Sequence, residues 1–206
     1  MKLLLKLSLI LLATAILIAG LFLPTNALAA SRSLEAAGAA LPDFEAFVKS
    51  VTDGRAGVVR GVYVPGLLAL PVEQQPAGKP AYVSPQEGAA TQFRRAADFG
   101  AIGLLAHNYL AGKSFFNLKN GQEVRIVYGD GAVKVYFVTA VYRYQALQPN
   151  SPSSNFVDQD TNETLSASSL FGKVYYQGDH VTFQTCIKKD GLSTWGRLFI
   201  VATPAK

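Results

Sequence analysis

The segment from Val181 to Ala202, VTFQTCIKKDGLSTWGRLFIVA, contains two strand-like runs and the only cysteine of the 206-residue chain. The runs are Val181–Ile187 and Gly196–Ala202, and turn residues separate them. Side chains alternate between the two faces of a strand, so Cys186 shares a face with the threonine and glutamine that precede it by four and two positions. The pattern predicts an antiparallel hairpin with its cysteine on the more polar face.

The pairing of this hairpin decides what lies beside the cysteine. If Ile187 faces Gly196, then Cys186 faces Arg197, and directly opposed side chains project to the same side. A slip of one residue would move Arg197 to the other face. An arginine within an apolar strand is costly unless a polar or anionic group meets it. Two interpretations stay open: a guanidinium that serves a site beside the sulfur, and a surface arginine on an edge strand.

A cysteine nucleophile needs a base or an imidazolium that holds its thiolate, and the chain has two histidines. His180 lies on the same strand as Cys186, but six residues of strand span roughly 20 Å, which excludes a direct contact. His107 ends the apolar run AIGLLAH and is the remaining candidate. The sequence therefore predicts a site of His107, Cys186 and Arg197. The alternative interpretation is an inert buried thiol and a structural histidine.

Residues 1–30 have the features of an export signal. MKLLLK gives a positive start, Leu7–Leu23 is an apolar run, and Ala27-Leu28-Ala29 fits the small-x-small cleavage pattern. The apolar run is also just long enough for a membrane anchor, so a cleaved signal and a retained anchor both stay open. Because the basic residues precede the run, either interpretation predicts an extracytoplasmic chain of the cell envelope, secreted or anchored.

Length and composition favour one folded domain after this segment. Half of the residues are hydrophobic and 16% are charged, which argues against extended disorder. No cluster of Lys and Arg remains after the leader, so nucleic-acid binding is not expected. Residues 31–54 are predicted to form a tether that ends in a short helix, because apolar residues recur at helical spacing before Gly54. Residues 55–206 are predicted to form the main domain.

Short β-like runs dominate that domain. They lie at VVRGVYV, LLALPV, AIGLLAH, EVRIVY and VKVYFVTAVYRY, and Gly129-Asp130-Gly131 predicts a hairpin between the last two. The SPQE sequence at 84–87 predicts a helix that begins at Ser84 and runs to about Ala97. The polar section Gln145–Asp179 predicts a functional or mobile connection with a helical turn in LSASSLFGKVYY. The expected fold is a mostly-β domain of about eight strands, closed or nearly closed into a barrel, with two short helices.

These segments resemble the sortases, the cysteine-dependent transpeptidases of bacterial cell envelopes. The resemblance covers roughly residues 57–204 and rests on GVYVPGLLALPV, GLLAHNYLAGKSFFNL, and VTFQTC followed by WGRLFIVA. It implies an eight-stranded closed β-barrel in which Cys186 is the nucleophile, His107 the acid/base and Arg197 the group that polarises the carbonyl. Thr185 and Asn108 are implied as support for the oxyanion or the substrate. Because Asn108 follows the histidine where many sortases have Arg or Thr, the subclass stays open.

The resemblance also implies partners. Sortases cut a sorting signal of a secreted protein, hold it as a thioester and pass it to an amine of the cell wall or a pilin, or to water. The DQDTNE turn, with Asp158, Asp160, Asn162 and Glu163, is similar to the calcium-binding loops of some sortases. It lacks the EF-hand glycine and distal glutamate, which favours a solvated acidic turn and no cofactor. The alternative function is a non-catalytic, envelope-associated β-barrel that binds peptides.

Overall fold

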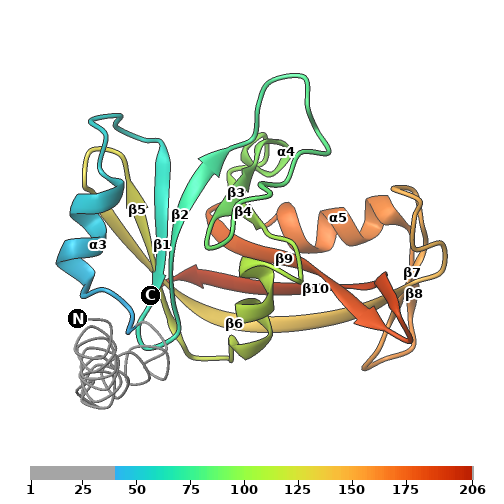
Figure 1. The fold of residues 1–206 in the computed structure, drawn as a ribbon. Helices are drawn as coiled ribbons and strands as arrows, with labels where there is room; N and C mark the ends of the chain where they lie inside the picture. The colour runs from blue at the N-terminus through green and yellow to red at the C-terminus, as the bar shows by residue number, and fades with distance from the viewer. Residues whose placement is uncertain (1–39, 206) are drawn as a thin grey trace, which may run out of the picture. The chain divides into compact units, whose positions relative to one another are not determined.

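The computed structural model describes residues 40–205, which form a sheet of ten strands that curls into a barrel (Figure 1). Eight strands pair in the order β10-β9-β4-β3-β2-β1-β5-β6, and β6 pairs back onto β10. The predicted eight-stranded closed barrel is therefore confirmed. β7 and β8 continue the sheet outward from β6. The strands are β1 (Val59–Val64), β2 (Leu68–Gln74), β3 (Ala90–Phe93), β4 (Ala101–Leu105), β5 (Glu123–Tyr128), β6 (Val133–Ala146), β7 (Phe156–Asp158), β8 (Thr164–Leu165), β9 (His180–Lys189) and β10 (Leu192–Pro204).

The barrel interior is a closed apolar core. Alternate residues of the strands point inward, as the period of two requires. Each of the inward residues in the following set is fully buried: Val62, Leu104, Ile126, Phe183, Leu198 and Ile200. Because β9 and β10 each contribute residues to this core, their other faces point outside the barrel. The side chains of Cys186 and Arg197 belong to that outer face.

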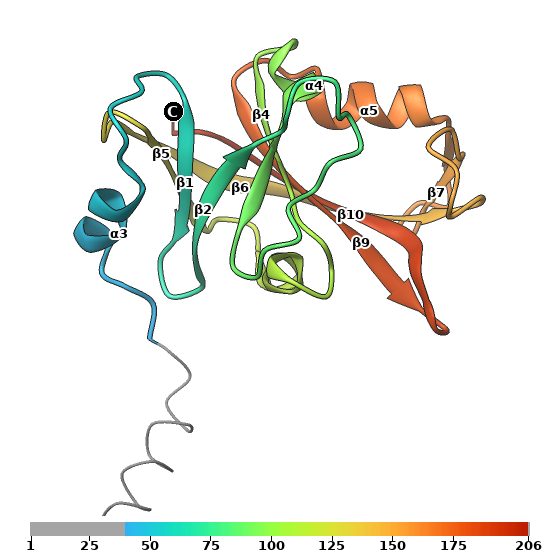
Figure 2. The same cartoon turned by 45° about the horizontal axis from the view of Figure 1, so that its top comes forward.

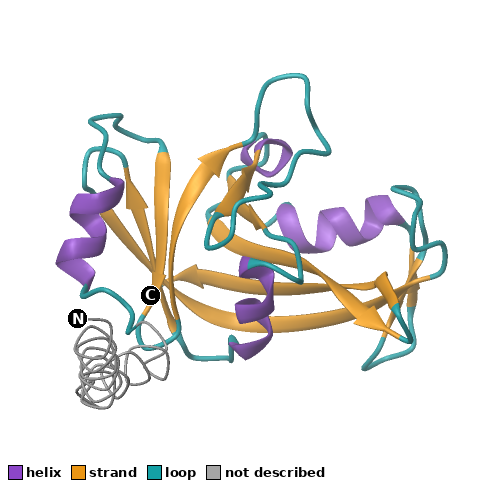
Figure 3. Cartoon of the chain, in the orientation of Figure 1, coloured by secondary structure: helices purple, strands orange, loops and turns teal. Residues whose placement is uncertain are grey.

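Three α-helices and one 3₁₀ helix accompany the strands in the described residues (Figure 3). They are α3 (Phe44–Val51), α4 (Arg94–Ala97), α5 (Ala167–Tyr175) and the 3₁₀ helix η1 (Ala111–Asn117). The predicted helix before Gly54 is confirmed as α3, which begins after Asp43, whose carboxylate accepts a hydrogen bond from the amide of Ala46. Phe47 packs this helix against the outside of β1.

Helix α5 covers the outer face of the sheet on the side of β9 and β10, away from α3 (Figures 1 and 2). Ser166 caps its N-terminus by accepting a hydrogen bond from the amide of Ser169. Leu170 and Val174 point from the helix into a second apolar cluster that includes Phe199 of β10. The expected helical turn in LSASSLFGKVYY is thus a helix of nine residues that roofs part of the outer face.

The helix predicted from Ser84 to Ala97 is wrong over most of its length. Residues 84–89 form turns, and Ala90–Phe93 is a strand that pairs with both β2 and β4. Ser84 accepts a hydrogen bond from the amide of Gln86 in a local turn, so its capping chemistry is used without a helix. The barrel closes only if a strand lies between β2 and β4. Pairing with these two strands therefore outweighs the local helix preference of the SPQE sequence.

The expected hairpin at Gly129-Asp130-Gly131 is confirmed between β5 and β6. The expected signal or anchor at residues 1–30, and the tether up to residue 39, lie outside the described residues. Within residues 40–205, no helix combines the length and apolar character that crossing a membrane requires.

Candidate active site

Strands β9 and β10 bring Cys186 and Arg197 together as directly opposed residues. The register pairs Ile187 with Gly196 and Cys186 with Arg197, as the sequence predicted, and the one-residue slip does not occur. Asp190 and Gly191 both have positive φ, which makes the connection between β9 and β10 a tight turn. A β-bulge between Leu192 and Gly196 absorbs the additional residues of β10.

His107 follows β4, the strand that pairs with β9 on the side opposite to β10. Strand β4 runs parallel to β9 and pairs Leu105 with Gln184. The amide of Ala106 still donates to the carbonyl of Gln184 at 3.2 Å, so the pairing continues one step past the end of β4. His107 is the next residue along the chain, just past the end of this pairing. Strand β9, which carries Cys186, thus lies between β10, which carries Arg197, and β4, which His107 follows.

The imidazole of His107 is partly exposed and stacks on the ring of Tyr109. The two ring centroids lie 5.1 Å apart with an interplanar angle of 18°. The backbone of His107 is fixed as well, because its carbonyl accepts hydrogen bonds from the amides of Leu110 and Gly112. A Cβ at Gly112 would lie 2.7 Å from this carbonyl oxygen and would also meet Thr185, so the turn tolerates only glycine there.

The guanidinium of Arg197 is oriented by backbone carbonyls. Its Nη1 donates to the carbonyls of Thr194 at 2.9 Å and Gly196 at 2.8 Å, and Nη2 donates to Pro149 at 3.3 Å. These contacts tie β10 to the connection that follows β6. The predicted polar partners of this arginine are therefore backbone oxygens of β10 and of the connection after β6. A surface arginine on an edge strand is excluded, because β10 pairs on both sides.

Thr185 lies on the inner face, away from the sulfur. It is 3% exposed, and its hydroxyl donates to the carbonyl of Ala106 at 2.8 Å. This hydrogen bond ties β9 to the residue that precedes His107. The geometry gives Thr185 a role in fixing the histidine segment, whereas a direct contact with an oxyanion on the outer face would need the opposite orientation.

We expect Thr185→Val to lower the free energy of unfolding by about 1–3 kcal/mol, because the buried Ala106 carbonyl loses its donor. Urea unfolding measures this change. Thr182→Val is the matched control, since Thr182 is also buried but its hydroxyl donates to the carbonyl of Val174 in α5. Turnover should fall only in Thr185→Val, where the histidine segment loosens. Equal turnover in both variants would contradict the positioning role.

Asn108 also holds this part of the chain in place. Its Nδ2 donates to the carbonyl of Ser193 at 2.9 Å, across 85 residues of sequence. A second contact nearby links Thr194 to Asn150, whose side-chain oxygen accepts a hydrogen bond of 3.1 Å. The residue after the histidine therefore anchors the β9–β10 hairpin through one hydrogen of its side-chain nitrogen.

A pocket with a volume of about 430 Å³ opens on the same outer face. It lies between α5, the outer face of β4, β9 and β10, and the connections around residues 80–83 and 151–152. Most of its lining is apolar, with Arg197 and Gln184 among the few polar groups. The apolar lining comprises Pro80, Ala81, Val83, Phe93, Leu105, Pro152, Phe156, Ala167, Leu170, Phe171, Val174 and Phe199. Such a composition suits a peptide whose apolar side chain is buried and whose backbone meets a few polar groups.

Solved structures with a similar fold include several sortases. Sortase A from Listeria monocytogenes has 16% identity, with 72% of this chain and 88% of that chain covered, and a TM-score of 0.44. Sortase A from Corynebacterium diphtheriae has 13% identity, coverage of 72% and 61%, and a TM-score of 0.48. Sortase C1 from Streptococcus suis has 12% identity, coverage of 80% and 79%, and a TM-score of 0.49.

No protein-family model matches the sequence, and no curated protein matches it either. The function proposed below is therefore inferred from the residues of the site and their geometry.

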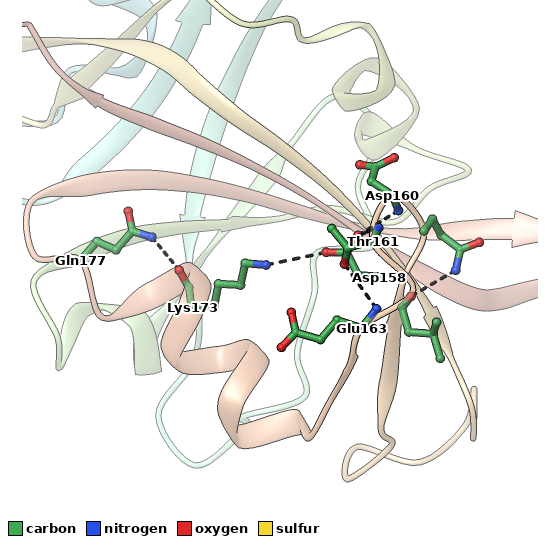
Figure 4. A network of polar contacts seen from close by, with 8 residues as sticks. Asp158, Asp160, Thr161, Glu163, Lys173 and Gln177 are labelled. Carbon is green, nitrogen blue, oxygen red and sulfur yellow. Dashed lines mark hydrogen bonds and ion pairs between the residues drawn. The ribbon is translucent and has the colours of Figure 1, made fainter.

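The acidic turn at residues 158–163 is held by the protein's own groups (Figure 4). Asp158 is 3% exposed, and its Oδ1 accepts hydrogen bonds from the amides of Asp160 at 2.9 Å and Thr161 at 3.2 Å. Its Oδ2 lies 3.7 Å from the ammonium of Lys173 on α5. In residues 40–205, no group of three or more His, Cys, Asp or Glu side chains is arranged to hold a metal ion, so Asp158, Asp160 and Glu163 do not form such a group.

The charge of Asp158 is stabilised locally. Burial raises the pKa of this carboxyl, but the hydrogen bonds from Asp160 and Thr161 and the charge of Lys173 outweigh burial, so the pKa lies below its usual value. The carboxylate is therefore ionised at neutral pH and faces an internal cation. The ion pair joins β7 to α5 and holds the roof of the pocket.

His180 is separate from the candidate site, as the sequence predicted. It is 1% exposed at the start of β9, where its ring nitrogens lie 2.7 Å from the carbonyl of Gly178 and 2.9 Å from that of Val174. These contacts fasten the end of α5 to the sheet. The role of His180 is thus structural, which leaves His107 as the candidate histidine of the site.

Proposed function

We propose that this protein is a sortase-type cysteine transpeptidase. It cuts a peptide bond in the sorting signal of a secreted protein and passes the acyl part to an amine of the cell wall or a pilin, or to water. The proposal is supported by the direct pairing of Cys186 with Arg197 across β9 and β10, by the place of His107 shortly after β4, which pairs with β9, and by an apolar pocket that Arg197 helps to line. A barrel that only bound peptides would have no need of all three groups.

The reaction follows from the chemistry of these groups. The thiolate of Cys186 attacks the scissile carbonyl, and the negative charge that develops on its oxygen is stabilised by Arg197 and a backbone N–H near the cysteine. The imidazolium of His107 donates its proton to the leaving amine as the C–N bond breaks, which leaves a thioester on the sulfur. His107 then takes a proton from the incoming amine or water, which attacks the thioester and restores the thiol.

The proposal extends to localisation. The positive start, the apolar run and the Ala-Leu-Ala sequence in residues 1–30 support export, by a cleaved signal or a retained anchor. An enzyme that acts on sorting signals has to be exported, because it encounters its secreted substrates only outside the cytoplasm.

Mass spectrometry of the purified protein tests the proposal directly. We expect incubation with candidate sorting peptides to give an acyl adduct on Cys186 that hydroxylamine removes, because a thioester is labile to that amine. The chain has one cysteine, so the adduct is assigned without ambiguity. Peptides that bind without forming an adduct would favour the non-catalytic peptide-binding barrel and overturn the proposal.

A further inference from the structure

Gln184 lies on the floor of the pocket, two residues before the cysteine. On β9 it shares the outer face with Cys186, and its paired neighbours are Phe199 on β10 and Leu105 on β4. All three of Gln184, Phe199 and Leu105 line the pocket. Gln184 therefore places an amide among apolar side chains, beside the proposed nucleophile.

The orientation of this amide is set by a buried tyrosine. The hydroxyl of Tyr175, on α5, donates to Oε1 of Gln184 at 2.6 Å. Tyr175 is 1% exposed and packs against the rings of Phe93, Phe171 and Phe199. Burial raises the pKa of Tyr175, which keeps it a protonated donor at neutral pH. Because Oε1 is engaged by this donor, the amide is held with a fixed direction.

The side-chain nitrogen of Gln184, Nε2, is free to donate a hydrogen bond to a ligand. Within the part of the chain that the structure describes, Nε2 of Gln184 makes no hydrogen bond, although the residue is partly buried. A bound peptide that covered this donor without pairing it would lose binding free energy. The backbone carbonyls of an extended peptide are the matching acceptors, and they recur along the chain at strand spacing.

We propose that Gln184 is a substrate-positioning residue whose Nε2 donates to a backbone carbonyl of the peptide bound in the pocket. Tyr175 holds the amide in the orientation that makes this donation possible. The inference rests on the proposed function, since it concerns a peptide at the same site. The pocket would then recognise a peptide in two ways: it buries an apolar side chain of the peptide, and Gln184 forms one hydrogen bond with the peptide backbone.

Gln184→Glu is the sharpest test, because the carboxylate still accepts from Tyr175 but replaces the amide donor with an acceptor. The probe is a positional library of Nα-acetylated hexapeptide amides, with acylation of Cys186 followed by mass spectrometry. For the peptides that react best, we expect KM to rise roughly tenfold or more, with kcat changed much less. Tyr175→Phe, which keeps the packing, should raise KM by a smaller factor of roughly three to five.

Thr182→Val is the matched control. Thr182 is the next residue along the outer face of β9 and also bonds to α5, but it does not line the pocket. We expect its KM to equal that of the wild type, whatever its stability. Thermal unfolding of each variant identifies any that fold poorly. An unchanged KM in folded Gln184→Glu or Tyr175→Phe, or an equal rise in Thr182→Val, would overturn the inference.

A binding measurement separates this inference from the proposed function. The same peptides are titrated into Cys186→Ala and into Cys186→Ala with Gln184→Glu, where no chemistry is needed. Weaker binding by the second protein supports the role of Gln184 even if the wild type forms no adduct, an outcome that would overturn only the proposed function. Equal binding by both proteins, or no binding by either, overturns the inference.

Discussion

Replacing Cys186 with alanine is expected to abolish both transfer and hydrolysis, with a loss of roughly 10⁴-fold or more in kcat. No other side chain of the candidate site can form the acyl intermediate, and the chain contains no second cysteine. The side chain lies at the outer face and is only partly buried, so its loss should leave the barrel intact. Turnover of a reactive library peptide, followed by chromatography, measures the effect.

Cys186→Ser is the companion variant. It keeps a nucleophilic atom of similar size, but a hydroxyl beside a lone imidazole is a far weaker nucleophile than a thiolate. We expect it to bind peptides as Cys186→Ala does and to turn them over almost as poorly. Thermal unfolding within a few degrees of the wild type would show that both variants fold. Residual turnover above a tenth of the wild-type rate in Cys186→Ala would contradict a covalent mechanism at this sulfur.

The pairing of Cys186 with Arg197 could be predicted from sequence because it depends on strand alternation. The period of two assigned Cys186 to the polar face, and one choice of pairing placed Arg197 opposite it. The features that fix this pairing could not be read from the sequence. The Asp190-Gly191 turn connects the two strands tightly, and the bulge after Leu192 takes up the additional residues of β10, so that Gly196 pairs with Ile187. Alternation also placed Thr185 on the apolar face, so its inward orientation could be predicted, whereas its bond to Ala106 depends on the parallel pairing of β4 with β9.

The failures come from contacts between segments distant in sequence. The SPQE signal at Ser84 is locally sound, yet residues 90–93 are taken into the barrel between β2 and β4. Gln184 was visible as a polar residue on the face of the cysteine, but nothing in the sequence shows that Tyr175 orients it. The carboxylates of the DQDTNE turn have calcium-like spacing, and only the fold shows that Lys173 of α5 already faces Asp158.

Arg197→Lys is expected to lower kcat by roughly 10²–10³-fold while KM changes little, since a guanidinium beside the developing oxyanion acts in the transition state. Lysine keeps the charge but cannot reproduce a planar group that donates to Thr194, Gly196 and Pro149 at once. The ammonium is therefore not held beside Cys186. Steady-state kinetics on a reactive peptide, with the yield of acyl adduct in a single turnover, shows whether acylation is the step that slows.

Arg143→Lys is the matched control, because Arg143 is also a strand arginine. It lies on β6 opposite Leu198, on the other face of the sheet from Arg197, and it is exposed. We expect its kinetics to match those of the wild type. If Arg197→Lys instead raised KM and left kcat unchanged, the guanidinium would bind the peptide equally in the ground and transition states. The rate enhancement of the enzyme would then come from the imidazole and the sulfur without a contribution from the guanidinium. The hydrogen bonds of Arg197 to backbone carbonyls would serve only to hold the connection after β6 against the β9–β10 hairpin.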